Sequence, residues 1–148
     1  MKISNASDHG GFDLKESIIQ HLKELGHEVI DEGTYDKSSV DYPLFARKTA
    51  NDVAEKRAEF GILCCTSGEG IMITANKVKG IRCGIGYNDE VAAKMREHND
   101  CNIIAFGGSY MDAKDVLKRV DIFLNTPFEG GRHQRRVDEI TEVERLGK

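Results

Sequence analysis

The chain has 148 residues, a formal net charge of -4 and charged residues of both signs mixed along most of its length. This length suits one domain, which we expect to span residues 1–148. The acidic balance argues against a nucleic-acid or anionic-membrane partner, because such partners require clustered positive charge. The apolar runs fall far short of the roughly 18 residues of a membrane span. Four cysteines without zinc-type spacing predict free thiols in a cytoplasmic protein.

Short β-rich runs alternate with longer runs of helical periodicity. Strands are predicted at residues 2–7, 27–31, 60–64, 81–85 and 103–106, and helices at about 12–25, 43–57, 71–78, 89–97, 112–124 and 132–146. This alternation predicts an α/β fold, a Rossmann-like three-layer α/β/α sandwich with a five-stranded parallel sheet. Ligands bind such sheets beyond the carboxyl ends of the strands.

The stretch 61–71 changes abruptly from apolar residues to small, polar and glycine residues. It predicts a buried strand, a tight turn that holds Cys65 and Ser67, and the start of a helix. Gly68 and Gly70 would let backbone N–H groups face inward as a cradle for an anion. Because side chains alternate across a strand, Cys64 is expected to pack in the core, while Cys65 lies at the turn, where the helix N-terminus favours a thiolate.

Several common motifs are excluded by spacing. The run Gly84-Ile85-Gly86-Tyr87-Asn88-Asp89 has Asp89 where a dinucleotide fingerprint needs its third glycine, and no P-loop sequence occurs. A cysteine phosphatase would need an arginine six residues after its nucleophile, but Ile71 lies six after Cys65. We therefore expect no cofactor.

Three further groups of residues each allow two explanations. Asp8 either caps the next helix or binds ligand beside His9. His98 is expected at the amino edge of the sheet, where it is either a helix C-terminal cation or a part of a second subunit's site. Arg132 and Arg136 share a face near a helix N-terminus; they either pair with nearby glutamates or bind an anion.

Taken together, the motifs resemble one family over nearly the whole chain. The motifs are Ser7-Asp8-His9-Gly10-Gly11, Val40-Asp41-Tyr42-Pro43, the Cys65 loop ending Gly68-Glu69-Gly70-Ile71, Ala75-Asn76-Lys77, Gly80-Ile81-Arg82, His98-Asn99-Asp100 and Glu129-Gly130-Gly131-Arg132-His133. Their combination resembles ribose-5-phosphate isomerase B, whose relatives include allose-6-phosphate and galactose-6-phosphate isomerases.

The resemblance implies metal-free isomerisation of an aldose phosphate to a ketose phosphate through a cis-enediolate. By that resemblance, Cys65 is the base, Ser67 moves protons between sugar oxygens, His98 opens the ring and Asp8 holds sugar hydroxyls. The substrate-binding residues it implies are His9, Thr66, Gly68, Gly70, Asn99, Arg132 and Arg136. It also implies a homodimer or a dimer of dimers with shared sites, in which the 132–146 helix packs on or across the dimer and His98 serves the partner's Cys65.

Two departures from the family pattern bear on the substrate. Thr66 stands where many relatives have glycine, and Ser109 lies in a stretch where many carry a phosphate-binding arginine. Ribose 5-phosphate is the leading substrate, and six-carbon sugar phosphates are the alternative. A non-catalytic sugar-phosphate sensor and a thiol redox protein that uses Cys64 and Cys65 are the competing functional classes.

Overall fold

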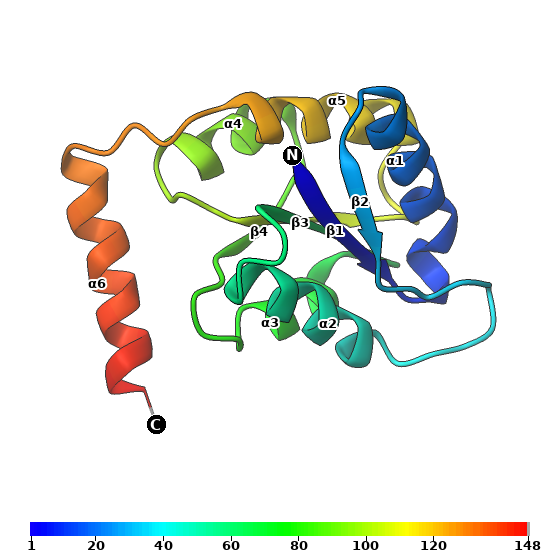
Figure 1. Ribbon diagram of the computed structural model, residues 1–148, viewed down its shortest axis with the longest axis horizontal. Helices are drawn as coiled ribbons and strands as arrows, with labels where there is room; N and C mark the ends of the chain where they lie inside the picture. The colour runs from blue at the N-terminus through cyan, green and yellow to red at the C-terminus, as the bar shows by residue number, and fades with distance from the viewer. Residues whose placement is uncertain (148) are drawn as a thin grey trace.

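A computed structural model describes residues 1–147 of the chain and shows a five-stranded parallel sheet between two layers of helices (Figure 1). The strands are β1 (Lys2–Ser7), β2 (Glu28–Asp31), β3 (Phe60–Cys65), β4 (Cys83–Ile85) and β5 (Ile103–Gly107). The helices are the short 3-10 turn η1 (His9–Gly11), α1 (Phe12–Glu24), α2 (Tyr42–Ala54), α3 (Glu69–Ala75), α4 (Asp89–Glu97), α5 (Ala113–Asn125) and α6 (Arg132–Leu146). The α/β sandwich predicted from the sequence is confirmed; Lys148, the last residue of the predicted domain, lies outside the described residues.

Two apolar cores lie on opposite faces of the sheet. Helices α1, α4 and α5 cover one face, where Ile18, Phe106 and Phe123 are fully buried. Helices α2 and α3 cover the other, with Ala50 and Ile71 in its core (Figure 1). Period-2 alternation along the buried strands supplies both cores.

Helix α6 lies apart from these layers. It follows an extended segment after α5 and stands beside the sandwich (Figure 1). Only His133 and Val137 are buried along it, whereas Ile140, Val143 and Leu146 are 46%, 71% and 60% exposed. The packing of α6 within its own chain is therefore slight.

Local signals account for several helix boundaries. The Asn88 side chain accepts a hydrogen bond from the Val91 N–H at 2.7 Å and caps α4, and Asp112 caps α5 through the Lys114 N–H at 2.8 Å. Gly26, with φ of 87°, follows the end of α1. The predicted strand at 81–85 was too long at its start, because Ile81 closes a turn on the Val78 carbonyl.

The strand order β2-β1-β3-β5-β4 decides which loops meet. The chain leaves β1 toward β2 on one side and reaches β3 on the other, so the β1–β3 boundary is a topological switch point, where ligands of such sheets bind. Strand β5 lies between β3 and β4, and its Gly107 is in register with Cys65. The loops after β1, β3 and β5 therefore converge, while the loop after β4 lies at the sheet edge.

Candidate active site

Cys65 is the last residue of β3. The sequence predicted it in the turn that follows the strand, and this placement was wrong by one residue. Its side chain is 4% exposed and packs with the α2/α3 core, whereas Cys64 faces the α1/α5 core. Burial raises the pKa of the Cys64 thiol, which therefore stays protonated. The Gly68 N–H donates to Cys65 Sγ at 3.1 Å. This contact places a backbone hydrogen-bond donor directly against the Cys65 sulfur.

The loop after Cys65 has a distinctive geometry. Gly68 has φ of 87°, a left-handed conformation in which a side chain would be strained. The Glu69 N–H donates to Ser67 Oγ at 3.2 Å, which leaves the Ser67 hydroxyl proton free for another acceptor. Gly70 lies in the first helical turn of α3, where backbone N–H groups lack helical partners. The Gly68 N–H is directed at the Cys65 sulfur and the Glu69 N–H at the Ser67 hydroxyl, so the anion cradle stays a prediction.

Neighbouring strand ends clamp this loop. The Gly108 N–H donates to the Cys65 carbonyl at 2.8 Å, and the Ser109 N–H donates to the Thr66 carbonyl at 3.1 Å. On the β1 side, a Cβ added at Gly10 would lie 2.1 Å from Thr66 Oγ1. These approaches fix the loop between the ends of β1 and β5.

Asp8 and His9 follow β1 beside the Cys65 loop. The Gly11 N–H donates to Asp8 Oδ1 at 3.0 Å, so the capping explanation for Asp8 is confirmed, and its second carboxylate oxygen remains available. His9 is exposed, and its Nδ1 accepts the Val40 N–H at 3.1 Å. In the neutral ring this bond places the remaining proton on Nε2, which can donate to an anionic ligand.

Tyr42 is a residue of this site that the sequence reasoning did not assign. A Cβ at Gly70 would lie 2.5 Å from Tyr42 Cζ, so the ring closes over the loop and requires glycine there. Its exposed fraction of 37% leaves part of the ring open to a ligand. Its place in the motif Val40-Asp41-Tyr42-Pro43 was the sequence signal that Tyr42 belongs to the site.

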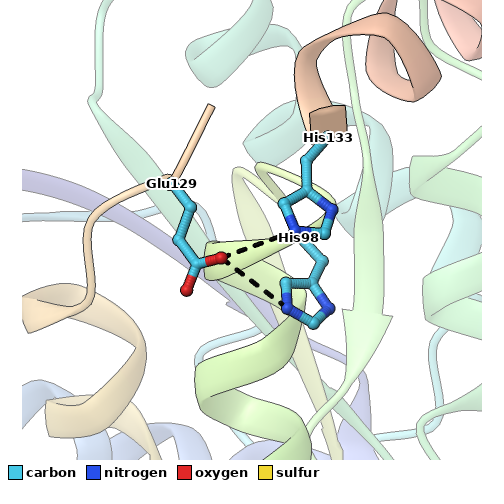
Figure 2. A group of neighbouring side chains, drawn as sticks. All are labelled: His98, Glu129 and His133. Atoms are coloured by element: carbon cyan, nitrogen blue, oxygen red, sulfur yellow. Dashed lines mark ion pairs between the residues drawn. The ribbon is translucent and has the colours of Figure 1, made fainter. Parts of the chain in front are cut away.

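A second group lies at the end of α4, around His98. The His98 and His133 rings stack with centroids 4.1 Å apart and planes at 12° (Figure 2). Glu129 Oε1 lies 3.4 Å from His133 Nε2 and 3.9 Å from His98 Nε2. Burial, followed by the positive charges of His98 and Arg132, lowers the pKa of His133. The i, i+4 spacing of Glu129 and His133 was a sequence signal for this contact.

The remaining predicted residues belong to the second group. Asn99 follows His98 and is exposed, and its carbonyl accepts the Arg82 Nε–H at 2.9 Å. Arg132 and Arg136 are exposed on α6. Glu142, a glutamate on the same helix, pairs with Arg145 and not with these arginines. Both arginines add positive charge near His133.

The two groups lie at opposite edges of the sheet. Cys65 ends β3 at the carboxyl edge, and His98 directly follows α4, which returns toward the amino ends of the strands. The structure brings Asp8, His9, Thr66, Ser67, Gly68 and Gly70 together around Cys65. It brings His98, Asn99, Arg132 and Arg136 together at the other edge.

His98, Glu129 and His133 also offer three ligand atoms within 4.8 Å of one another, a combination that could in principle hold a metal ion. Zinc ligands surround the ion so that their lone pairs converge on it. Each Nε2 lone pair lies in the plane of its own ring, and because the two stacked planes are nearly parallel, the lone pairs do not converge on one point. This arrangement suits stacking better than coordination.

The fold and the residues around Cys65 define a class of protein. It is an α/β protein with a thiol and backbone N–H groups at the switch point of a parallel sheet. The sequence model of a family described as Ribose/Galactose Isomerase matches residues 3–140. The chain belongs to this family. No helix among residues 1–147 combines the length and apolar character needed to cross a bilayer.

Relatives agree over almost the full chain. Ribose-5-phosphate isomerase B of Escherichia coli (strain K12) is 44% identical over 143 residues, which cover 97% of this chain and 96% of that protein. The structure of Clostridium thermocellum ribose-5-phosphate isomerase B has a TM-score of 0.98 and 46% identity, with 99% of both chains covered. The Mycoplasma genitalium enzyme, described with bound ribulose-5-phosphate, has a TM-score of 0.94 and 38% identity, with 99% of this chain and 97% of that chain covered.

Proposed function

We propose that this protein is an aldose-ketose isomerase that interconverts ribose 5-phosphate and ribulose 5-phosphate through a cis-enediolate. The observation that carries the proposal is the hydrogen bond from the Gly68 N–H to Cys65 Sγ at the carboxyl end of β3. It supports a thiolate base at the position where ligands bind this fold. The relatives named ribose-5-phosphate isomerase B support the substrate class.

The proposed reaction moves protons without a covalent enzyme adduct. The Cys65 thiolate takes the proton from C2 of the open-chain aldose, the C1=C2 double bond forms, and the carbonyl electrons move to O1. Ser67 relays the O2 proton to O1. The enediolate then collapses to a C2 carbonyl while C1 takes the proton back from Cys65. Backbone N–H groups at Gly70 and around the loop stabilise the negative oxygen.

Substrate binding involves groups on both sides of the loop. The free oxygen of Asp8 accepts sugar hydroxyls, and His9 Nε2 donates to the phosphate. Thr66 and Gly68 line the reacting carbons. Four free thiols suit a reducing compartment, so a cytoplasmic location is part of the proposal.

The second group completes the site in a homodimer or a dimer of dimers. A strand of five residues is about 17 Å long, so His98 is poorly placed to serve the Cys65 of its own chain. We infer that it opens the sugar ring in the partner's site, where Asn99, Arg132 and Arg136 bind the substrate. Helix α6 supports this arrangement because a groove of about 730 Å³, lined by Ile81, Ile140 and Val143, separates it from its own sandwich.

Ribose 5-phosphate is the leading substrate, and allose 6-phosphate or galactose 6-phosphate is the alternative. The alternative is favoured by Ser109, which supplies no cation to the phosphate at the β5 loop. It also fits the name of the family, which includes galactose isomerase. A non-catalytic sensor of the same sugar phosphates would bind them without turnover.

The first experiment compares Cys65→Ala with Cys64→Ala on the three aldose phosphates. Cys64 is the matched control because its thiol is adjacent in sequence but buried on the other face of the sheet. We expect Cys65→Ala to lose turnover of the preferred substrate and Cys64→Ala to retain it. Full activity in Cys65→Ala would refute the thiol base. Thermal stabilisation of the wild type by all three sugars without turnover would instead favour the sensor.

The second experiment tests the shared site by mixing subunits. Cys65→Ala and His98→Asn are each expected to be inactive. After unfolding and refolding together, half of random dimers pair one of each, and each such dimer has one intact site. About a quarter of wild-type activity should then return. No recovery, with mixed dimers verified by mass spectrometry, would place both groups in one subunit's site.

A further inference from the structure

The segment between α5 and α6 presents a carboxylate and an imidazole to His98. His133 is 7% exposed and covers one face of the His98 ring, while the His98 side chain retains 33% exposure. Glu129 Oε1 lies against the Nε2 atoms of both rings (Figure 2). One face of His98 is thus packed by His133, and about a third of the His98 side chain remains accessible to a ligand.

The backbone fixes this arrangement. The Glu129 N–H donates to the Glu97 carbonyl at 3.1 Å, which attaches the segment to the end of α4 directly before His98. Gly130 and Gly131 have φ of 69° and 53°, a turn that side chains would strain. The His133 N–H then donates to the Gly130 carbonyl at 3.0 Å as α6 begins. The turn returns His133 to the carboxylate of Glu129.

We propose that His133 and Glu129 are positioning residues that hold His98 in the orientation and protonation state needed to open the sugar ring. The inference rests on the proposed isomerase function. Stacking by His133 limits rotation of the His98 ring. Glu129 stabilises the imidazolium that forms while His98 carries a proton.

Ring opening needs a group that both takes and gives a proton. His98 takes the proton of the O1 hydroxyl, the C1–O1 bond becomes a carbonyl, and the C1–O4 bond breaks with its electrons moving to O4. His98 then gives the proton to O4. Between these transfers it is cationic, and its charge is balanced by Glu129 alone in this cluster.

The charges around the stack favour a single imidazolium. His133 faces His98, Glu129, Arg132 and Arg136. Asp100, two residues from His98, is already held by Arg96 at 2.8 Å and by Arg82. A second proton on His133 would place two cations in contact with only one carboxylate. His133 therefore stays neutral while His98 cycles.

The experiment separates ring opening from proton transfer at carbon. Ribose 5-phosphate is a closed furanose in solution, whereas ribulose 5-phosphate is open because its O5 carries the phosphate. Turnover of ribose 5-phosphate requires ring opening. Exchange of solvent deuterium into C1 of ribulose 5-phosphate requires only the carbon base. Both are measured for wild type, His133→Ala, His133→Phe and Glu129→Gln, with circular dichroism as a check of folding.

We expect His133→Ala to lower kcat for ribose 5-phosphate roughly threefold to tenfold, the range for loss of an aromatic pair, with KM little changed. Deuterium exchange should stay within about twofold, because the carbon base is intact. His133→Phe should restore much of kcat since it can stack, and Glu129→Gln should lower kcat and spare exchange.

Equal loss of turnover and exchange in both His133→Ala and Glu129→Gln, or no loss in either, would overturn the inference. If His133→Ala does not fold, His133→Phe and Glu129→Gln decide by the same two readouts. Absence of both turnover and exchange in the wild type would refute the isomerase function itself and the inference with it. The two failures are therefore distinguishable.

Discussion

Gly107→Ala tests whether contact with β5 sets the geometry of the Cys65 loop. A Cβ at Gly107 would lie 2.4 Å from the Ser67 carbonyl oxygen and 2.6 Å from its carbon. Ordinary contacts begin near 3.4 Å, so the loop or the strand must move by about 1 Å. The obstacle is backbone, which cannot turn aside as a flexible side chain can.

The expected cost falls mainly on catalysis. A misplacement of about 1 Å near reacting groups costs on the order of 100-fold in rate, whereas overpacking of this kind destabilises a fold by about 1–3 kcal/mol. We expect Gly107→Ala to remain folded and to lose kcat for ribose 5-phosphate by about that factor. The assays are steady-state ketose formation and urea unfolding.

Gly84→Ala is the matched control in the neighbouring strand β4. There the nearest atom to an added Cβ is the terminal carbon of Met95 at 3.2 Å, and this flexible side chain can move. Gly84→Ala should keep wild-type kcat. Wild-type kcat in Gly107→Ala, or equal losses in the two variants, would refute the claim that β5 positions the loop.

Two further predictions concern titration and thiol reactivity. Hydrogen bonding to Asp52, with burial, raises the pKa of Glu32 to about 7, so its stabilising effect is complete below pH 4.5 and is lost as pH rises through 7. Wild-type Tm should therefore fall from pH 5 to pH 8 more than that of Glu32→Gln, and parallel curves would contradict this. Burial raises the pKa of Cys101 to about 11 and that of Cys64 further. Iodoacetamide at pH 8 should thus modify Cys65 first by peptide mapping; equal labelling of Cys64 would exclude a selectively activated Cys65.

Much of the Cys65 site could be predicted from local sequence. The apolar run into Thr66-Ser67-Gly68 predicted the strand, the turn and the helix start, because buried strands and left-handed glycines leave short-range signals. The cap made by Asp8 follows from its place before η1. The functional roles of these residues remain predictions.

Contacts made across the fold were not predictable in this way. Lys15 is 1% exposed and pairs with Asp31 at 2.7 Å, although an isolated lysine in a helix is normally at the surface. The Glu129 and His133 contacts to His98 required the α5–α6 segment to fold back on α4. Tyr42 above Gly70 is a contact between two helices.

The sequence by itself therefore determined the alternation of strands and helices, the strand, turn and helix start around Cys65 and the unusual place of His98. These depend on periodicity and on residues a few positions apart. Only the tertiary structure decided that β5 lies beside β3, so that Gly107 lies against the Cys65 loop, and that His98 is stacked at the opposite edge. Strand order and side-chain stacking are set by burial between distant segments, which leaves no local pattern to read.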